Sequence, residues 1–192
     1  MTEPTRKLVL ASQSPRRLML LREAGYAVEV IPAHADELWP ENLPPAEAVV
    51  VLAMRKAQAV AGAFPDQPVL GADTAVVIDD EALGKPESRS EAADMLNRLA
   101  GRTHTVFSGV ALVRGAYSQT GCERSDVTFH ELSAEKIEQY LDHAEYMDKA
   151  GAYGIQEHGR ELVVSHTGRV DTIVGLPMNV VDHLMQQIAK AA

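Results

Sequence analysis

The sequence predicts an α/β protein built around one mixed sheet. Short apolar runs, of which residues 69–78 form the longest, are typical of strands that are covered on both faces. Longer segments between them begin with helix caps and end at glycines. Because strands and helices do not alternate strictly, we expect parallel and antiparallel strands in the same sheet. A chain of 192 residues without an evident linker suits a single domain over residues 1–192.

The first half of the chain is predicted to contain three strands and two helices. Ser14 is a typical N-cap and Pro15 suits the first helical position, so a helix begins there and ends at Gly25. A second helix ends at Gly62. The other elements are strands over 7–11, 28–31 and 69–78, a polar loop over 32–45, a helix over 46–61 and a hairpin turn at 79–81.

The second half is predicted to contain three further strands and three helices. Gly101 ends the first of these helices, and Ser133 caps the second. The small-residue segment 147–156 is irregular, with one helical turn, and Pro177 opens the last helix. The strands are expected over 103–113, 123–132 and 161–165, and the first two helices over 90–100 and 133–143.

The composition favours a cytoplasmic protein with a small ligand. A net charge of −9 argues against a non-specific grip on DNA or RNA, which needs a basic face. The single Cys122 cannot form an internal disulfide, so a reducing compartment is expected. Residues 1–7 lack the apolar core of a signal peptide, and no run approaches a membrane span. An anionic ligand of such an acidic chain needs locally clustered cations, so a cluster of arginine and lysine would indicate where the ligand binds.

The first such cluster lies where a predicted strand meets a predicted helix. Ser12 precedes the helix, and Arg16 and Arg17 stand in its first turn, where carboxylates are usually favoured. Free backbone N–H groups at a helix N-terminus attract phosphate, so an anion held here would justify the two arginines. The alternative is that both arginines point to solvent or pair with acids elsewhere.

A second candidate is Asp73, an acid in the middle of the apolar strand. A buried carboxylate is costly unless it is paired or bound to a cation. Such a group suits a general base, and Gly71 and Ala72 are expected to leave room for a ligand beside it. A structural ion pair is the competing interpretation.

Two lysines are weaker candidates. Lys56 interrupts an apolar helix face, and its default interpretation is that the ammonium snorkels outward, although it could instead reach a buried anion. Lys85 is held between Gly84 and Pro86 after the hairpin, where solvated lysines are common. The acids at 79–81 are better interpreted as a solvated turn than as a metal site.

Familiar catalytic motifs are absent. The sequence contains no Walker-type loop, no GxGxxG after a strand, no GxSxG and no HExxH. The residues alone therefore indicate an α/β enzyme for an anionic substrate, with Asp73 as its base.

Taken together, the motifs resemble those of the Maf family of nucleotide pyrophosphatases. In order along residues 7–177 they are LVLASQSPRR, Asp36-Glu37, Arg55-Lys56-Ala57, GADTAVV, GKP, GRTHTVFSGVAL, DKAGAYGIQ and VGLP. The resemblance implies an elongated central sheet flanked by helices, with two lobes around a cleft, a fold shared with ITPase-like proteins. It also implies metal-dependent hydrolysis of a nucleoside triphosphate between the α- and β-phosphates, with Mg²⁺ or Mn²⁺ as cofactor.

The resemblance also assigns roles to individual residues. Asp73 matches the proton acceptor, and Glu37 matches an acid that would help Asp73 hold the metal. The phosphate-binding positions match Ser12, Arg16, Arg17, Lys56 and Lys85. Arg16, Thr74 and Gln156 match the positions tied to base selection, and all three agree with the branch that acts on dTTP and UTP.

One segment departs from the family pattern. Where the family usually has Gly-Ser-Tyr, this chain has Gly168-Arg169-Val170, which puts any phosphate contact there in doubt. The alternatives to a dTTP/UTP pyrophosphatase are an enzyme for 7-methyl-GTP or for a broad range of nucleotides, and a nucleotide-binding regulator of cell division. The expected partner is a nucleotide rather than a nucleic-acid polymer or a membrane, and a homodimer is the default assembly.

Overall fold

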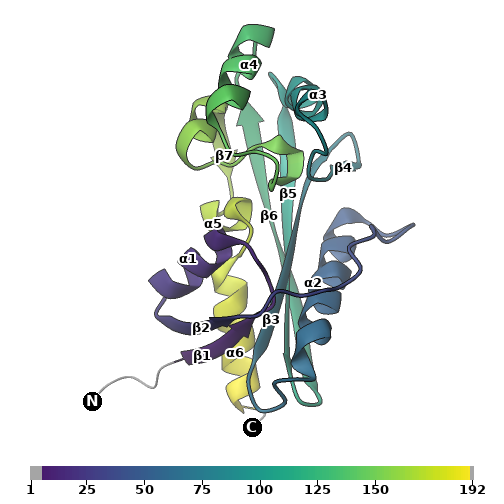
Figure 1. The fold of residues 1–192 in the computed structure, drawn as a ribbon, viewed down its shortest axis with the longest axis vertical. Coiled ribbons are helices and arrows are strands. Elements are labelled where there is room, and N and C mark those ends of the chain that lie inside the picture. The colour runs from purple at the N-terminus through teal and green to yellow at the C-terminus, as the bar shows by residue number, and fades with distance from the viewer. Residues whose placement is uncertain (1–5, 191–192) are drawn as a thin grey trace. The chain divides into compact units, whose positions relative to one another are not determined.

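The computed structural model describes residues 6–190 (Figure 1). The strands are β1 (Arg6–Leu10), β2 (Tyr26–Val30), β3 (Val69–Ile78), β4 (Glu81–Leu83), β5 (Thr103–Arg114), β6 (Tyr117–Phe129) and β7 (Val163–Thr167). The helices are α1 (Pro15–Glu23), α2 (Pro45–Ala61), α3 (Arg89–Leu99), α4 (Ala134–His143), α5 (Val170–Val174) and α6 (Met178–Lys190), with 3₁₀ helices η1 (Ala150–Ala152) and η2 (Glu157–Leu162). Among these residues no helix is both long and apolar enough to cross a membrane.

The seven strands form one sheet in the order β2-β1-β3-β5-β6-β7, with β4 paired to β3. β1 runs parallel to β2 and to β3. β4 is antiparallel to β3, and β7 is antiparallel to β6. The predicted α/β fold with a mixed sheet is therefore confirmed.

The described chain divides into two compact units. Within residues 6–190, unit 1 contains 6–73, 108–123 and 175–190, and unit 2 contains 74–107 and 124–174. β3, β5 and β6 contribute residues to both units. Each unit has its own apolar core, built around Leu10, Leu21, Leu70 and Leu184 in unit 1 and around Leu96, Phe129, Ile137 and Leu162 in unit 2.

In unit 1, local sequence signals determine where α1 begins and ends. The Ser14 hydroxyl accepts a hydrogen bond from the backbone N–H of Arg17, and Pro15 is the first helical residue, as predicted. Gly25 follows the helix with a φ of +83°, a conformation that glycine adopts without strain. β2 begins at the next residue, so the chain reverses within a short turn.

In unit 2, a tight hairpin joins β3 to β4. Ile78 pairs with Glu81, which leaves Asp79 and Asp80 as a two-residue loop. Both have positive φ values, +53° and +61°, as a type I′ turn requires. The predicted turn at 79–81 is confirmed, and its acids form ion pairs with arginines, Asp79 with Arg102 and Glu81 with Arg98.

The predicted and observed elements differ at several places. β6 spans Tyr117–Phe129 rather than 123–132, because its first residues are mostly exposed and polar and give no apolar signal. β7 begins at Val163 rather than at residue 161, since η2 extends through Leu162. The short helix α5 was not predicted; four of its five residues are β-branched, a composition that favours strands.

Candidate active site

The centre of β3 is the one partly exposed part of an otherwise buried strand. Val69–Ala72 and Ala75–Ile78 are buried, whereas Asp73 and Thr74 are partly exposed. β1 pairs with the start of the strand and β4 with its end, so these two residues lie between the paired stretches. The strand thus holds a carboxylate at a fixed position that solvent can reach.

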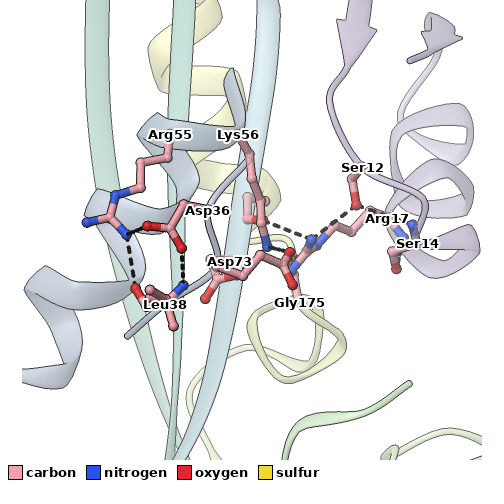
Figure 2. Close-up of polar contacts among 11 residues, drawn as sticks. Ser12, Ser14, Arg17, Asp36, Leu38, Arg55, Lys56, Asp73 and Gly175 are labelled. Atoms are coloured by element: carbon pink, nitrogen blue, oxygen red, sulfur yellow. Dashed lines mark hydrogen bonds and ion pairs between the residues drawn. The ribbon is translucent and has the colours of Figure 1, made fainter. Parts of the chain in front are cut away.

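Lys56 of α2 supplies the counter-charge for this carboxylate. Its Nζ lies 2.6 Å from Oδ1 of Asp73 and 2.7 Å from Oε1 of Glu37. The side chains of Lys56 and Asp73 are only 11% and 16% exposed, and that of Glu37 is 58% exposed. The expectation that Lys56 snorkels outward is therefore wrong, and its alternative, a lysine that reaches an anion, is correct. Figure 2 shows Lys56 extended toward Asp73.

Gly71 brings α2 close enough for this contact. A Cβ at Gly71 would lie 2.2 Å from the carbonyl oxygen of Ala53 and 2.7 Å from the backbone nitrogen of Ala57. The helix backbone therefore fills the space that a side chain would take. The expectation that Gly71 leaves room for a ligand is wrong; its missing side chain admits the helix turn that carries Lys56.

Two consecutive bases on α2 pair with two consecutive acids of the preceding loop. Lys56 contacts Glu37, and Nη1 of Arg55 lies 3.8 Å from Oδ2 of Asp36. Arg55 also donates a hydrogen bond to the Leu38 carbonyl at 2.9 Å, and Asp36 accepts one from the Leu38 N–H at 2.8 Å (Figure 2). Arg55 thus holds the loop that presents Glu37. Reasoning from the sequence did not assign this role, although matching the two charge pairs would have suggested it.

Arg17 ties the start of α1 to two other segments. Its Nη1 donates to the Ser12 hydroxyl at 3.1 Å and to the Ala72 carbonyl at 2.9 Å, and its Nε donates to the Gly175 carbonyl at 2.9 Å (Figure 2). Ser12 is itself buried and accepts a further bond from the Ser14 N–H at 3.2 Å. Arg17 therefore does not point to solvent; it fixes the loop before α1 against the residue that precedes Asp73.

The charges around Arg17 share one electrostatic environment. Burial lowers the pKa of Arg17 from its ordinary value. The charge of Asp73 opposes that effect, that of Arg16 adds to it, and that of Glu37 opposes it. Two cations and two carboxylates from three separate segments of unit 1 are therefore close enough to influence one another.

The remaining predicted site residues belong to unit 2. Thr74 follows Asp73 on β3 and is partly exposed, and Lys85 and Gln156 are exposed. One backbone hydrogen bond connects the segments of the last two, because the Gly151 N–H donates to the Gly84 carbonyl at 3.0 Å. The structure thus joins the loop before Lys85 to the segment that leads to Gln156.

The segment that departs from the family pattern is well ordered by its own contacts. The guanidinium of Arg169 bonds to the Asp171 carboxylate, with Nη2 to Oδ2 at 2.6 Å. The Ser125 hydroxyl donates to the Arg169 carbonyl at 3.0 Å, and α5 begins at Val170. Arg169 and Val170 therefore start a helix rather than leaving an open loop.

The donor set suits a hard divalent cation that is shared with a substrate. Among residues 6–190 no group of three or more His, Cys, Asp or Glu side chains could hold a metal. Glu37 and Asp73 nevertheless bring two carboxylates onto one cation, the Lys56 ammonium. Mg²⁺ is commonly bound by one or two carboxylates and completed by substrate phosphates, so this pair fits such an ion.

A family model and several relatives match most of this chain. The family model described as Maf-like protein matches residues 7–188. A dTTP/UTP pyrophosphatase of Symbiobacterium thermophilum is 49% identical, over 90% of this chain and 89% of that protein. A dTTP/UTP pyrophosphatase of Moorella thermoacetica is 48% identical, over 93% of each chain. The Staphylococcus aureus Ham1 protein shares the fold, with a TM-score of 0.51 and 14% identity over 97% of this chain and 100% of its own.

Proposed function

Because the chain belongs to the Maf-like protein family, we propose that it hydrolyses dTTP and UTP to the nucleoside monophosphate and pyrophosphate. The observation that carries the proposal is the Asp73 carboxylate, fixed at the partly exposed centre of β3 and paired with Lys56. A carboxylate inside a buried strand is costly unless it is paired, and Asp73 meets this condition while it stays partly accessible to solvent. The names and high coverage of the relatives support the same activity.

The reaction needs a base for water and cations for phosphate. The water oxygen bonds to the α-phosphorus, and the bond from that phosphorus to the bridging α–β oxygen breaks, which releases pyrophosphate. Asp73 takes the proton that the water loses. Because negative charge grows on the leaving pyrophosphate, cations aimed at it stabilise the transition state.

Lys56 is placed to bind the carboxylates first and the substrate phosphates afterwards. In the nucleotide-free protein its ammonium forms ion pairs with Asp73 and Glu37. A triphosphate carries more negative charge than either carboxylate, so it competes for the same ammonium. When Lys56 turns to the phosphates, Asp73 loses its counter-ion and becomes available as a base.

Glu37 and Asp73 would hold a divalent metal ion, Mg²⁺ or Mn²⁺, which would neutralise triphosphate charge when bound. Arg55 contributes indirectly, because its contacts with Asp36 and Leu38 keep Glu37 near Lys56.

The other assigned residues bind and select the nucleotide. Ser12, Arg16, Arg17 and Lys85 provide hydroxyl and cationic groups for the phosphates. Arg17 is well suited to this because its bonds to Ala72 and Gly175 hold the guanidinium in one orientation. Arg16, Thr74 and Gln156 select the pyrimidine base.

The proposed partner is a small nucleotide, with no nucleic-acid polymer and no membrane. The net charge of −9 supports this, since a polyanion would be repelled outside the local cation cluster. We place the enzyme in the cytoplasm, where nucleotides are abundant, and expect a homodimer.

Product analysis tests the proposal most directly. With dTTP or UTP and Mg²⁺ or Mn²⁺, chromatography should show monophosphate and pyrophosphate as the first products, and EDTA should abolish turnover. Initial formation of diphosphate and orthophosphate would overturn the assigned bond.

A substrate panel tests the base. Wild-type protein should hydrolyse dTTP and UTP with a higher kcat/KM than 7-methyl-GTP, and Thr74→Gln with Gln156→Glu should weaken that preference. Equal or better hydrolysis of 7-methyl-GTP by the wild type would contradict the pyrimidine assignment while leaving the pyrophosphatase activity intact.

A further inference from the structure

Unit 2 contains a buried polar pair with no place in the reaction described above. His104 of β5 and Tyr153 are 2% and 5% exposed. Nε2 of His104 and the hydroxyl of Tyr153 lie 2.7 Å apart. Both rings also pack edge-on against Phe129, with centroid separations of 4.9 Å for His104 and 4.7 Å for Tyr153.

Filling the core with this polar pair reduces the stability of the fold. Nδ1 of His104 is buried and makes no hydrogen bond within the described part of the chain. Burial lowers the pKa of His104 to about 4 and raises the pKa of Tyr153, so both groups are neutral near pH 7. A buried polar atom without a partner costs stability, and two apolar rings of similar shape would avoid that cost. The pair therefore contributes a defined geometry more than stability.

The geometry it fixes is a strained turn just before Tyr153. Gly151 and Ala152 both have left-handed backbones, with φ values of +67° and +61°. For alanine this conformation is unfavourable and persists only where surrounding contacts enforce it. Val76 closes one side of the turn, since a Cβ at Gly151 would lie 3.0 Å from its side chain. The Tyr153 hydroxyl anchors the other side through His104.

The same turn connects the two segments of unit 2 that carry assigned nucleotide contacts. The Gly151 N–H donates to the Gly84 carbonyl at 3.0 Å, and Gly84 precedes Lys85. Gln156 lies three residues after Tyr153. A shift of the turn would therefore move both segments together.

We propose that His104 and Tyr153 are positioning residues, whose hydrogen bond fixes the Gly151–Ala152 turn and thereby the segments that carry Lys85 and Gln156. The inference rests on the proposed function, because it takes the roles of those two residues from it. Neither member of the pair is a catalytic residue; each acts on nucleotide recognition through the backbone.

The decisive variant is His104→Phe with Tyr153→Phe. It keeps rings of similar shape and removes every polar atom of the pair, so its melting temperature should equal or exceed those of the two single variants. KM for dTTP should nevertheless rise about fivefold or more, with kcat changed less. Hydrogen exchange at the Gly151 N–H should accelerate, because the turn is no longer anchored.

Tyr153→Phe alone loses only the hydroxyl and gives the same test should the double variant fail to fold. Tyr26→Phe removes another buried tyrosine hydroxyl and its hydrogen bond, to Asp182 in unit 1, so it is the matched control and should leave KM and exchange at Gly151 near wild type. An unchanged KM in the folded double variant overturns the inference, and so does a raised KM with unchanged exchange. Absence of dTTP hydrolysis by the wild type would overturn the proposed function instead, and hydrogen exchange would still report whether the pair anchors the turn.

Discussion

The ammonium of Lys56 and the carboxylate of Asp73 approach to 2.6 Å, and the same ammonium lies 2.7 Å from Glu37. Lys56 comes from α2, Asp73 from β3 and Glu37 from the loop before α2. One positive charge therefore holds together two negative charges that would otherwise repel each other. The pairing offsets one of the two negative charges, so a metal ion bound by these carboxylates would have to compete with Lys56.

Lys56→Gln should change the binding of cations and of nucleotides in opposite directions. Without the ammonium, Mn²⁺ no longer competes with Lys56 for Glu37 and Asp73, so the nucleotide-free variant should bind Mn²⁺ more tightly than the wild type. Nucleotide binding should weaken by about 10- to 100-fold, the loss expected for one charge-assisted phosphate contact. Calorimetric titration with Mn²⁺ and with a non-hydrolysable dTTP analogue measures both.

Lys136→Gln is the matched control for Lys56. It breaks another lysine–carboxylate ion pair, with Glu161 in unit 2, and neither residue belongs to the assigned metal pair. Mn²⁺ affinity should therefore change much less than in Lys56→Gln. If the two variants bind Mn²⁺ with equal affinity, competition between Lys56 and the metal does not explain the tighter Mn²⁺ binding of Lys56→Gln.

Asp73→Asn should separate catalysis from folding. The amide keeps the shape of the side chain but cannot accept the proton, so turnover should fall about 10²- to 10⁴-fold. Nucleotide binding should persist, because Arg16, Arg17 and Lys56 remain and one repelling charge is lost. Thermal melts, nucleotide titration and turnover on this variant check the three statements. A folded variant with near wild-type turnover would exclude Asp73 as the base.

Gly71→Ala should disrupt the contact between α2 and β3. The added Cβ would lie 2.2 Å from the Ala53 carbonyl oxygen, so the helix must move away and take Lys56 with it. We expect a stability loss of about 1–3 kcal/mol and reduced activity per folded molecule. Gly62→Ala is the control: a Cβ there meets nothing within 4 Å, and its φ of −60° suits alanine. Urea unfolding should distinguish the two, and equal stability would contradict the close approach.

Strong local signals made much of this fold predictable. β3 was predicted with its observed bounds because all of its ten residues except Asp73 and Thr74 are apolar or small. The start of α1 was predicted because Ser14 and Pro15 act through neighbours in the chain. β6 was misplaced because none of residues 117–122 is buried, and such a strand is determined by its partner rather than by its own pattern.

The contacts of the candidate site were harder to foresee, because they depend on packing. The sequence marks Lys56 as an exception on an apolar face but does not show which strand the helix meets. The close approach of α2 to β3 at Gly71 decides which strand the helix meets. As a result, the Lys56 side chain reaches Asp73 instead of pointing outward to solvent. The bonds of Arg17 to Ala72 and Gly175 are likewise long-range, and backbone carbonyls carry no sequence signature.

The buried His104 should make stability depend on pH. Burial lowers its pKa from 6.5 to about 4, opposed by the charge of Asp126. Between these values the unfolded chain binds a proton that the folded chain does not, so this group reduces stability as the pH falls from 6.5 toward 4. The reduction over the whole window is on the order of 3 kcal/mol.

Urea unfolding at several pH values checks this statement. The fall in stability toward acid should be steeper in the wild type than in the variant with His104→Phe and Tyr153→Phe, which lacks the titrating group. The pKa of Tyr153 is raised from 10 by burial and so lies far above this pH range, and the other titrating side chains are common to both proteins. Parallel curves would therefore show that His104 does not cause the fall in stability.

The hairpin between β3 and β4 offers a way to stabilise the chain for engineering. Asp80 adopts a left-handed backbone, with a φ of +61°, at the second position of a type I′ turn, where Asp-Gly is strongly preferred. Asp79 keeps its ion pair with Arg102, so only Asp80 needs to change. Asp80→Gly should add a few tenths to about 1 kcal/mol of stability. A background of this kind would offset part of the stability lost through costly substitutions such as Gly71→Ala, which would make it easier to assay their chemistry at ordinary temperatures.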